Sequence, residues 1–150
     1  MKAGNSRIRR AQVADAAGLA SCIDAAYARY TGHLTDLPPV SEGCAAEIEN
    51  NQVWVAVDDG EIVAGLVLVA QAAAMKLANV AVHPDHGGRG LGRELLALSE
   101  TEARKQGYSE MRLNTHVGMP ENVRFYIRLG WKEISREGNT VSMSKRLEPE

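Results

Sequence analysis

The sequence predicts an α/β domain with a mixed sheet, and three patterns in its 150 residues support this class. Apolar residues recur at helical spacing in some segments and in alternating or continuous runs in others. Two turn sequences, Asp59-Gly60 and Gly138-Asn139, each separate a pair of strand-like segments. A further strand-like run leads through a glycine-rich loop into an amphipathic run, which is typical of a strand followed by a helix.

The first half of the chain predicts a strand, two helices and a hairpin. Leu19, Ile23 and Ala26 fall at helical spacing, and the second arm of the hairpin is almost continuously apolar, as in a strand buried on both faces. Glycine and prolines interrupt the segment between the two helices, which predicts a loop there. In chain order we expect strand 6–10, helix 14–29, loop 31–41, a weaker helix 41–50, and strands 53–57 and 62–69.

The second half predicts two strands that alternate with two helices, followed by a final hairpin. Leu91, Leu95 and Leu98 share one face of a helix, which Gly107 closes. In chain order we expect strand 74–82, helix 90–106, strand 110–115, helix 121–129 closed by Gly130, and strands 131–136 and 140–147. No repeat or linker interrupts this order, so we expect one domain over residues 1–150.

Composition excludes several classes of protein. A net charge of −2 and a pI near 6.1 argue against a nucleic-acid binder, and no apolar window is long enough to span a membrane. The first ten residues lack the apolar core of a secretory signal. Cys22 and Cys44 have no metal-like or redox spacing, so we expect reduced thiols and a cytoplasmic protein. Pro84 breaks helical spacing between His83 and His86, so no metal site is expected.

Four glycines, Gly87, Gly88, Gly90 and Gly92, fall between the strand 74–82 and the helix that follows it. At such a junction the first helical N–H groups have no internal partner, and the absence of side chains lets a diphosphate approach them. The spacing is not that of a dinucleotide-binding fingerprint, and no Gly-Lys-Ser/Thr follows. The loop therefore predicts a phosphate-bearing ligand other than a dinucleotide or ATP; a tight turn without a ligand is the alternative.

Two motifs together resemble those of the GCN5-related N-acetyltransferases, the GNAT superfamily. The pattern V-x-V-x-P-x-x-x-G-x-G-L-G-x-x-L-L over residues 80–96 is similar to the acetyl-CoA-binding motif, and F-Y-x-x-L-G over residues 125–130 is similar to a second hallmark. The resemblance covers essentially the whole chain. It implies a mixed, mostly antiparallel twisted sheet of about seven strands, flanked by about four helices and splayed at a central parallel strand pair.

The resemblance also implies how acetyl-CoA, the expected cosubstrate, would bind. Its diphosphate would lie on the backbone amides of the glycine loop, and its pantetheine arm would pair with the strand before the loop. Relatives usually carry Arg or Gln where this chain has Gly87, and we expect Arg89 to compensate. The family's usual coenzyme-contacting asparagine corresponds to Met119, which leaves Asn122, an expected helix N-terminal residue, as the candidate. The cosubstrate-binding residues implied are Val80, Ala81, Val82, Gly87, Gly88, Arg89, Gly90, Leu91, Gly92, Arg93 and Asn122.

For catalysis, the resemblance implies that Tyr126 is the general acid, because it matches the tyrosine of the second motif. Spacing alone favours a core tyrosine instead, packed by Phe125 and Leu129. A backbone N–H near Val80 would stabilise the oxyanion.

The family frequently has a carboxylate base on the strand before the loop or on the strand after its helix, but neither residues 75–79 nor residues 112–116 supply one here. We therefore name His116, two residues after Asn114, as the candidate base. The alternatives are that His116 is only a solvated histidine at a strand end, that His33 or Glu42 is the base, or that bulk water takes the proton.

The acceptor site would lie on the first helix and the loop after it. Tyr27, Tyr30, His33 and Asn114 are its candidate residues, although the two tyrosines could instead pack in the core. The favoured function is transfer of an acetyl group to a primary amine by direct attack in a ternary complex, with a small-molecule amine preferred over a peptide amine. The alternatives are a non-catalytic acyl-CoA-binding module and a protein N-terminal or lysine acetyltransferase. We expect no nucleic-acid or membrane partner, no metal, and a monomer or homodimer.

Overall fold

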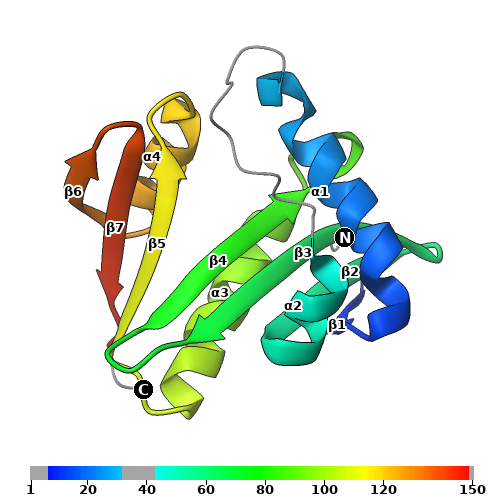
Figure 1. Cartoon of the computed structure of the whole chain (residues 1–150), viewed down its shortest axis with the longest axis horizontal. Helices are drawn as coiled ribbons and strands as arrows, with labels where there is room; N and C mark the ends of the chain where they lie inside the picture. Colours follow the sequence, from blue (N-terminus) through cyan, green and yellow to red (C-terminus); the bar gives the residue numbers. More distant parts are fainter. Residues whose placement is uncertain (1–6, 32–42, 149–150) are drawn as a thin grey trace.

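The computed structural model describes residues 7–31 and 43–148 and, in the first range, the side chains of residues 7–28. Its strands form one seven-stranded sheet in the order β1-β2-β3-β4-β5-β7-β6 (Figure 1). The strands are β1 (Arg7–Arg10), β2 (Gln52–Asp58), β3 (Glu61–Ala70), β4 (Met75–Val82), β5 (Glu110–His116), β6 (Lys132–Glu137) and β7 (Thr140–Arg146). The helices are α1 (Ala16–Thr31), α2 (Cys44–Asn50), α3 (Leu91–Lys105) and α4 (Pro120–Arg128). The predicted mixed sheet with its flanking helices is thus confirmed.

The centre of the sheet is splayed, as the family resemblance implied. All neighbouring strands are antiparallel except β4 and β5, which are parallel and pair only at Met75–Met111 and Lys76–Arg112. Beyond Lys76 the two strands diverge (Figure 1). Ala78 is an extra residue in β4 relative to β3, and such a bulge bends the strand that carries it. The bend therefore begins where the pairing with β5 ends.

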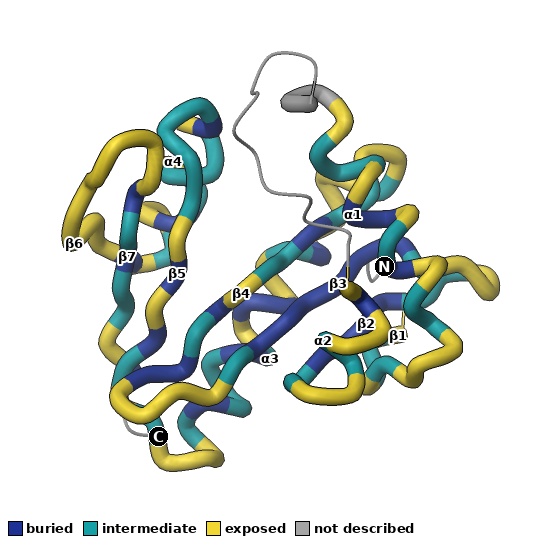
Figure 2. The backbone as a smooth tube through the Cα atoms, viewed as in Figure 1, coloured by how far each residue is buried: buried dark blue, intermediate teal, exposed yellow. Residues whose placement is uncertain are grey.

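Helices cover both faces of the sheet and create two apolar clusters (Figure 2). On one face Leu19 and Ile23 of α1 pack on β2, β3 and β4. A methyl group of Leu19 lies where a Cβ atom of Gly65 would stand, which explains the glycine in the middle of β3. On the other face Leu91 and Leu95 of α3 join Tyr126 of α4 in the larger cluster. The elements that surround the splay are thus fixed by apolar packing on both sides.

The first hairpin follows its sequence signal closely. Asp59 and Gly60 have φ angles of 53° and 80°, and two residues in this left-handed region match the twist of the flanking strands. Gly107 and Gly130 follow the ends of α3 and α4 as predicted. The second hairpin also forms, and every residue of β6 is exposed, with an irregularity in its register beside Ile134.

Most element boundaries agree with the prediction to within one residue, whereas the first two helices differ by more. The first helix begins at Ala16, because Val13–Asp15 form a 3₁₀ turn, and it continues to Thr31. The weaker helix begins at Cys44, after Gly43, whereas the predicted start at Ser41 and Glu42 lies outside the described residues.

Cys22 and Cys44 are both buried and free. Burial raises the pKa of the Cys22 thiol to about 11, so this thiol is uncharged at neutral pH. Across residues 7–31 and 43–148, no helix has the length and apolar composition that crossing a membrane requires.

Candidate active site

The glycine-rich loop joins β4 to α3 through a 3₁₀ turn at Pro84–His86. Gly88 and Gly90 have φ angles of 78° and 82°, which lie in the left-handed region that favours glycine. Gly90 is also the N-cap of α3, and it supplies no side-chain hydrogen bond to the first amides of that helix. The loop thus leads into uncapped N–H groups at a helix N-terminus, where a negative charge is stabilised.

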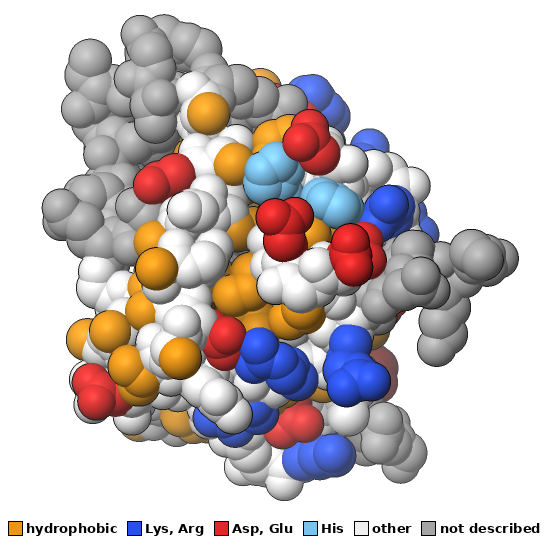
Figure 3. All heavy atoms as spheres, turned by 90° about the vertical axis from the view of Figure 1, so that its right-hand side faces the viewer, with side chains coloured by type: hydrophobic (Ala, Val, Ile, Leu, Met, Phe, Trp, Pro, Cys, Tyr) orange, Lys and Arg blue, Asp and Glu red, His pale blue; other side chains and the backbone are white. Residues whose placement is uncertain are grey.

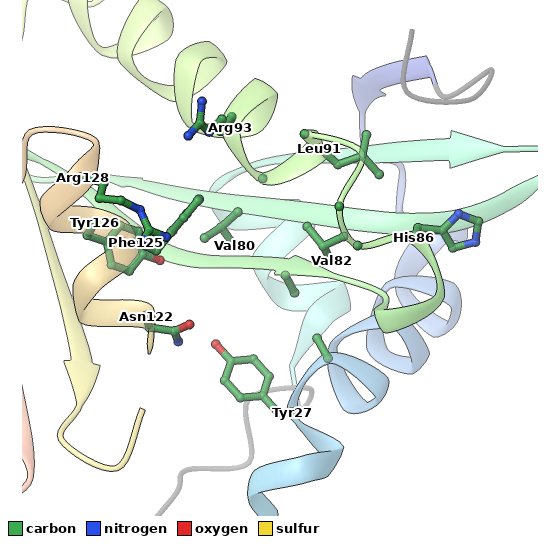
Figure 4. Close-up of a pocket in the computed structure, with 16 residues that line it drawn as sticks. Tyr27, Val80, Val82, His86, Leu91, Arg93, Asn122, Phe125, Tyr126 and Arg128 are labelled. Atoms are coloured by element: carbon green, nitrogen blue, oxygen red, sulfur yellow. The ribbon is translucent and has the colours of Figure 1, made fainter. Parts of the chain in front are cut away.

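A cavity of about 630 Å³ lies beside this loop, between α1, β4, α3 and α4 (Figure 4). Tyr27 and Tyr126 line it, together with most residues that the sequence predicted to bind the cosubstrate. Those residues are Val80, Ala81, Val82, Gly87, Gly88, Gly90, Leu91, Gly92, Arg93 and Asn122. The structure therefore brings the loop, one edge of β4 and two phenols to the same cavity.

The edge of β4 that faces the splay carries backbone groups available to a ligand. His83 donates its backbone N–H to the carbonyl oxygen of Val63 on β3, at 2.9 Å. Because alternate residues of a strand point their backbone groups to opposite sides, Val80 and Val82 point theirs away from β3. The gap left by β5 lies on that side, since the pairing between β4 and β5 ends at Lys76. An extended ligand could hydrogen-bond there as an added strand.

Arg89, which we expected to bind the cosubstrate, is not among the described residues that line the cavity. Its Nη1 atom donates instead to Oδ2 of Asp58, at the end of β2, at 3.0 Å. The Arg89 guanidinium is thus engaged by a carboxylate in this structure.

Two other arginines supply positive charge to the cavity. Arg93 lies in the first turn of α3 and Arg128 at the end of α4, and both line the cavity with largely exposed side chains (Figure 4). Neither forms an ion pair with another residue in the described part of the chain. Both guanidinium groups can therefore approach a phosphate-bearing ligand.

Tyr126 lies in the middle of α4 and is only 8% exposed. Its ring contacts Phe125 and Trp131 edge-on, with centroid separations of 5.6 and 5.8 Å. Burial, and then the nearby Tyr27, raise the pKa of Tyr126 well above its ordinary value. The phenol is therefore protonated at neutral pH and can donate a hydrogen bond to a group in the cavity.

Tyr27 reaches the same cavity from α1, on the opposite face of the sheet. Its hydroxyl donates to Oδ1 of Asn79 on β4 over a long distance of 3.5 Å, and Figure 4 shows it directed toward Asn122. Burial raises the pKa of Tyr27 as well, so both phenols are neutral donors. Asn122 lies in the first turn of α4 as expected, but Met119 occupies the N-cap position.

His116 and Asn114 do not line the cavity. Nδ1 of His116 accepts the backbone N–H of Gly118 at 2.8 Å, and Oδ1 of Asn114 accepts the hydroxyl of Ser142 at 2.9 Å. In a neutral imidazole whose Nδ1 is an acceptor, Nε2 carries the proton, so this geometry disfavours His116 as a base. Of the other acceptor candidates, His33 and the side chain of Tyr30 lie outside the described residues.

The cavity also contains residues that sequence reasoning missed, namely Ala26, His86, Phe125 and Arg128. Helical spacing could have identified Phe125, because it lies three residues after Asn122 on the same helix. The rings of His83 and His86 pack together with centroids 5.9 Å apart. In the part of the chain that the structure describes, no group of three His, Cys, Asp or Glu could hold a metal ion.

Comparison with known proteins adds two findings to this geometry. A family model described as an acetyltransferase (GNAT) domain matches residues 49–133. The PaiA N-acetyltransferase of Thermoplasma acidophilum, solved with coenzyme A, is 20% identical with a TM-score of 0.85, covering 95% of this chain and 99% of its own. The ribosomal-protein-S18-alanine N-acetyltransferase of Escherichia coli is 19% identical with a TM-score of 0.75, covering 95% of this chain and 94% of its own. Nourseothricin acetyltransferase is 18% identical with a TM-score of 0.74, covering 95% of this chain and 99% of its own. At these identities the likeness shows a shared fold.

Proposed function

The chain belongs to the GNAT acetyltransferase family, and we propose that it transfers the acetyl group of acetyl-CoA to a primary amine by direct attack in a ternary complex. One observation carries this proposal. A single cavity contains the N-terminus of α3, the open edge of β4 and the phenol of Tyr126. The helix N-terminus could bind a diphosphate, the strand edge could bind a pantetheine arm, and the phenol could protonate a leaving thiolate.

Acetyl-CoA would lie along the splay. The uncapped amides at the start of α3 suit its diphosphate, and Arg93 and Arg128, which line the cavity, add positive charge. The pantetheine arm would bond to the backbone of Val80 and Val82, where β4 has no neighbouring strand. An N–H of the same strand would then face the thioester carbonyl and stabilise the oxyanion.

Tyr126 would assist departure of the thiolate. The amine nitrogen forms a bond to the carbonyl carbon, the carbon–sulfur bond breaks, and the sulfur gains a proton while the amine loses one. Because the pKa of Tyr126 is raised, the phenol holds its proton at neutral pH. It would donate this proton as the carbon–sulfur bond breaks and charge develops on the sulfur. A positioned acid typically contributes about 10²- to 10⁴-fold in rate.

The proton that the acceptor amine loses would pass to water rather than to His116. Nδ1 of His116 already accepts a hydrogen bond from Gly118, and no carboxylate is among the described residues that line the cavity. A His116→Gln variant should accordingly keep the wild-type dependence of turnover on pH. Loss of an inflection near neutral pH in that variant would restore His116 as the base.

For the acceptor we propose a small-molecule primary amine that enters beside Tyr27. Tyr27 lines the same cavity as Tyr126, and its hydroxyl, which also reaches Oδ1 of Asn79, offers a polar group to the amine. We place the reaction in the cytoplasm, a compartment that suits two free, buried cysteines.

The test is release of free CoA thiol from acetyl-CoA over a panel of amines. The panel should contain polyamines, amino acids, an antibiotic amine and peptides with a free N-terminal alanine, each with and without enzyme. Turnover with a small amine supports the proposal, whereas turnover confined to the peptides redirects it to protein N-termini. Tight CoA binding with no turnover on any amine would instead indicate a non-catalytic binding module.

A further inference from the structure

Asp58 lies at the end of β2, directly before the turn of the first hairpin, and its carboxylate faces the back of the glycine loop. Oδ2 accepts from Nη1 of Arg89 at 3.0 Å and lies 3.8 Å from Nδ1 of His86. The Asp58 side chain is only 17% exposed, so water screens these charges less than at an open surface. Figure 3 shows the two adjacent histidines with acidic side chains around them.

The two partners of Asp58 bracket the most deformable part of the loop. His86 precedes Gly87 and Gly88, and Arg89 follows them. Gly88 and Gly90 adopt left-handed φ angles and have open surroundings, so no side-chain packing holds the backbone there. Glycine-rich backbone loses more conformational freedom on ordering than any other. The hydrogen bond from Arg89 to Asp58 therefore fixes one side of the glycines to the hairpin, and His86 lies close to the same carboxylate on their other side.

We propose that Asp58 is a positioning residue for acetyl-CoA, which acts by holding Arg89 so that the loop is ordered before the diphosphate arrives. The inference rests on the proposed function, since it assumes that the loop receives the diphosphate. Asp58 does not touch the cosubstrate, because it does not line the cavity. Arg89, in turn, contributes through the loop conformation and not through a contact with phosphate.

The test compares two acetyl donors in an Asp58→Asn variant. Asparagine has the same shape but lacks the negative charge that holds Arg89. Acetyl-CoA carries the diphosphate, whereas S-acetylpantetheine carries the same thioester and arm without it. We expect the KM for acetyl-CoA to rise about five- to tenfold, as when a partly buried charged hydrogen bond is lost, and the KM for S-acetylpantetheine to stay unchanged.

Two further variants sharpen this result. Asp59→Asn is the matched control, because Asp59 is the adjacent, exposed aspartate and asparagine tolerates its left-handed φ of 53°. It should behave as wild type with both donors. Arg89→Ala should reproduce the defect of Asp58→Asn, and the double variant should be no worse than either single one.

Each outcome decides a separate point. A wild-type or lower KM for acetyl-CoA in Asp58→Asn would overturn the inference. An unchanged KM would mean that the Asp58–Arg89 bond does not affect cosubstrate binding, and a lower KM would mean that the released Arg89 binds phosphate directly. Equal losses with both donors would also overturn it, because they indicate general damage to the fold. If the wild type itself neither binds CoA nor turns over either donor, the proposed function fails instead.

Discussion

Replacing Gly92 by alanine should stabilise the protein and weaken CoA binding at the same time. Gly92 is the second residue of α3, and its φ is not in the left-handed region. A Cβ atom there would lie 3.6 Å from Cζ of Phe125 and 3.9 Å from Cγ2 of Val82, which are ordinary packing distances. Alanine favours a helix over glycine by up to about 1 kcal/mol, so the melting temperature should rise by roughly 1–4 °C.

The same methyl group would stand in the cavity, between the amides of α3 and the edge of β4. A diphosphate oxygen must approach those amides to about 2.8 Å, and the methyl group keeps it farther away. Loss of one hydrogen bond to a charged group costs about 1.5–3 kcal/mol, which raises the Kd for CoA roughly ten- to hundredfold.

Calorimetric titration with CoA and thermal unfolding without ligand measure the two effects separately. Ala97→Gly is the control, because Ala97 is exposed on the same helix outside the cavity. It should lower the melting temperature without changing the Kd, and the double variant should regain wild-type stability but keep the weak binding. An unchanged Kd in Gly92→Ala would refute the assignment of the diphosphate to these amides.

Three further results are expected. Tyr126→Phe should lower the turnover number at least about tenfold with little change in the Kd for acetyl-CoA, and unaltered turnover would remove the phenol as the acid. Gly87→Arg should lower the Kd for CoA, because the added guanidinium can contact the diphosphate. The backbone tolerates the side chain, since Gly87 has a φ of −67° and its Cβ would meet only the Pro84 carbonyl oxygen, at 3.5 Å. An equal or higher Kd would contradict this prediction. Finally, the pKa of Cys22 rises from 9.0 unfolded to about 11 in the fold, so the folded state keeps a proton that the unfolded state loses. The free energy of unfolding should therefore fall by about 3 kcal/mol as the pH rises through this range, and Cys22→Ala should remove most of that fall in urea titrations. Equal pH slopes in both proteins would assign the loss to other groups, such as the buried tyrosines.

The features that sequence patterns predicted well depend on short-range chemistry. The turn at Asp59-Gly60 requires two left-handed residues in succession, and few residue pairs other than Asp-Gly or Asn-Gly provide them. The glycine loop was equally visible, because a strand, a run of glycines and a helix follow one another directly. Such local patterns predict the structure correctly because the conformation they require does not depend on contacts with residues far away in the sequence.

The partners of charged side chains were not predictable in the same way. Arg89 is in the loop, but Asp58 is 31 residues away and meets it only because β2 and β4 lie on either side of β3. The bond from Gly118 to His116 depends on how the chain turns after β5, which no periodicity encodes. The sequence therefore predicted which segments form the site more accurately than which side chains are available within it.

The narrow junction between β4 and β5 divides the molecule into two parts with different tasks. The part before it carries the loop proposed to hold the diphosphate, and the part after it carries Tyr126. Only two residue pairs of the ladder join them, so the angle between the parts depends on helix packing more than on backbone bonds. Acceptor preference could consequently diverge during evolution through changes in packing that tilt one part against the other, with the cosubstrate loop left intact.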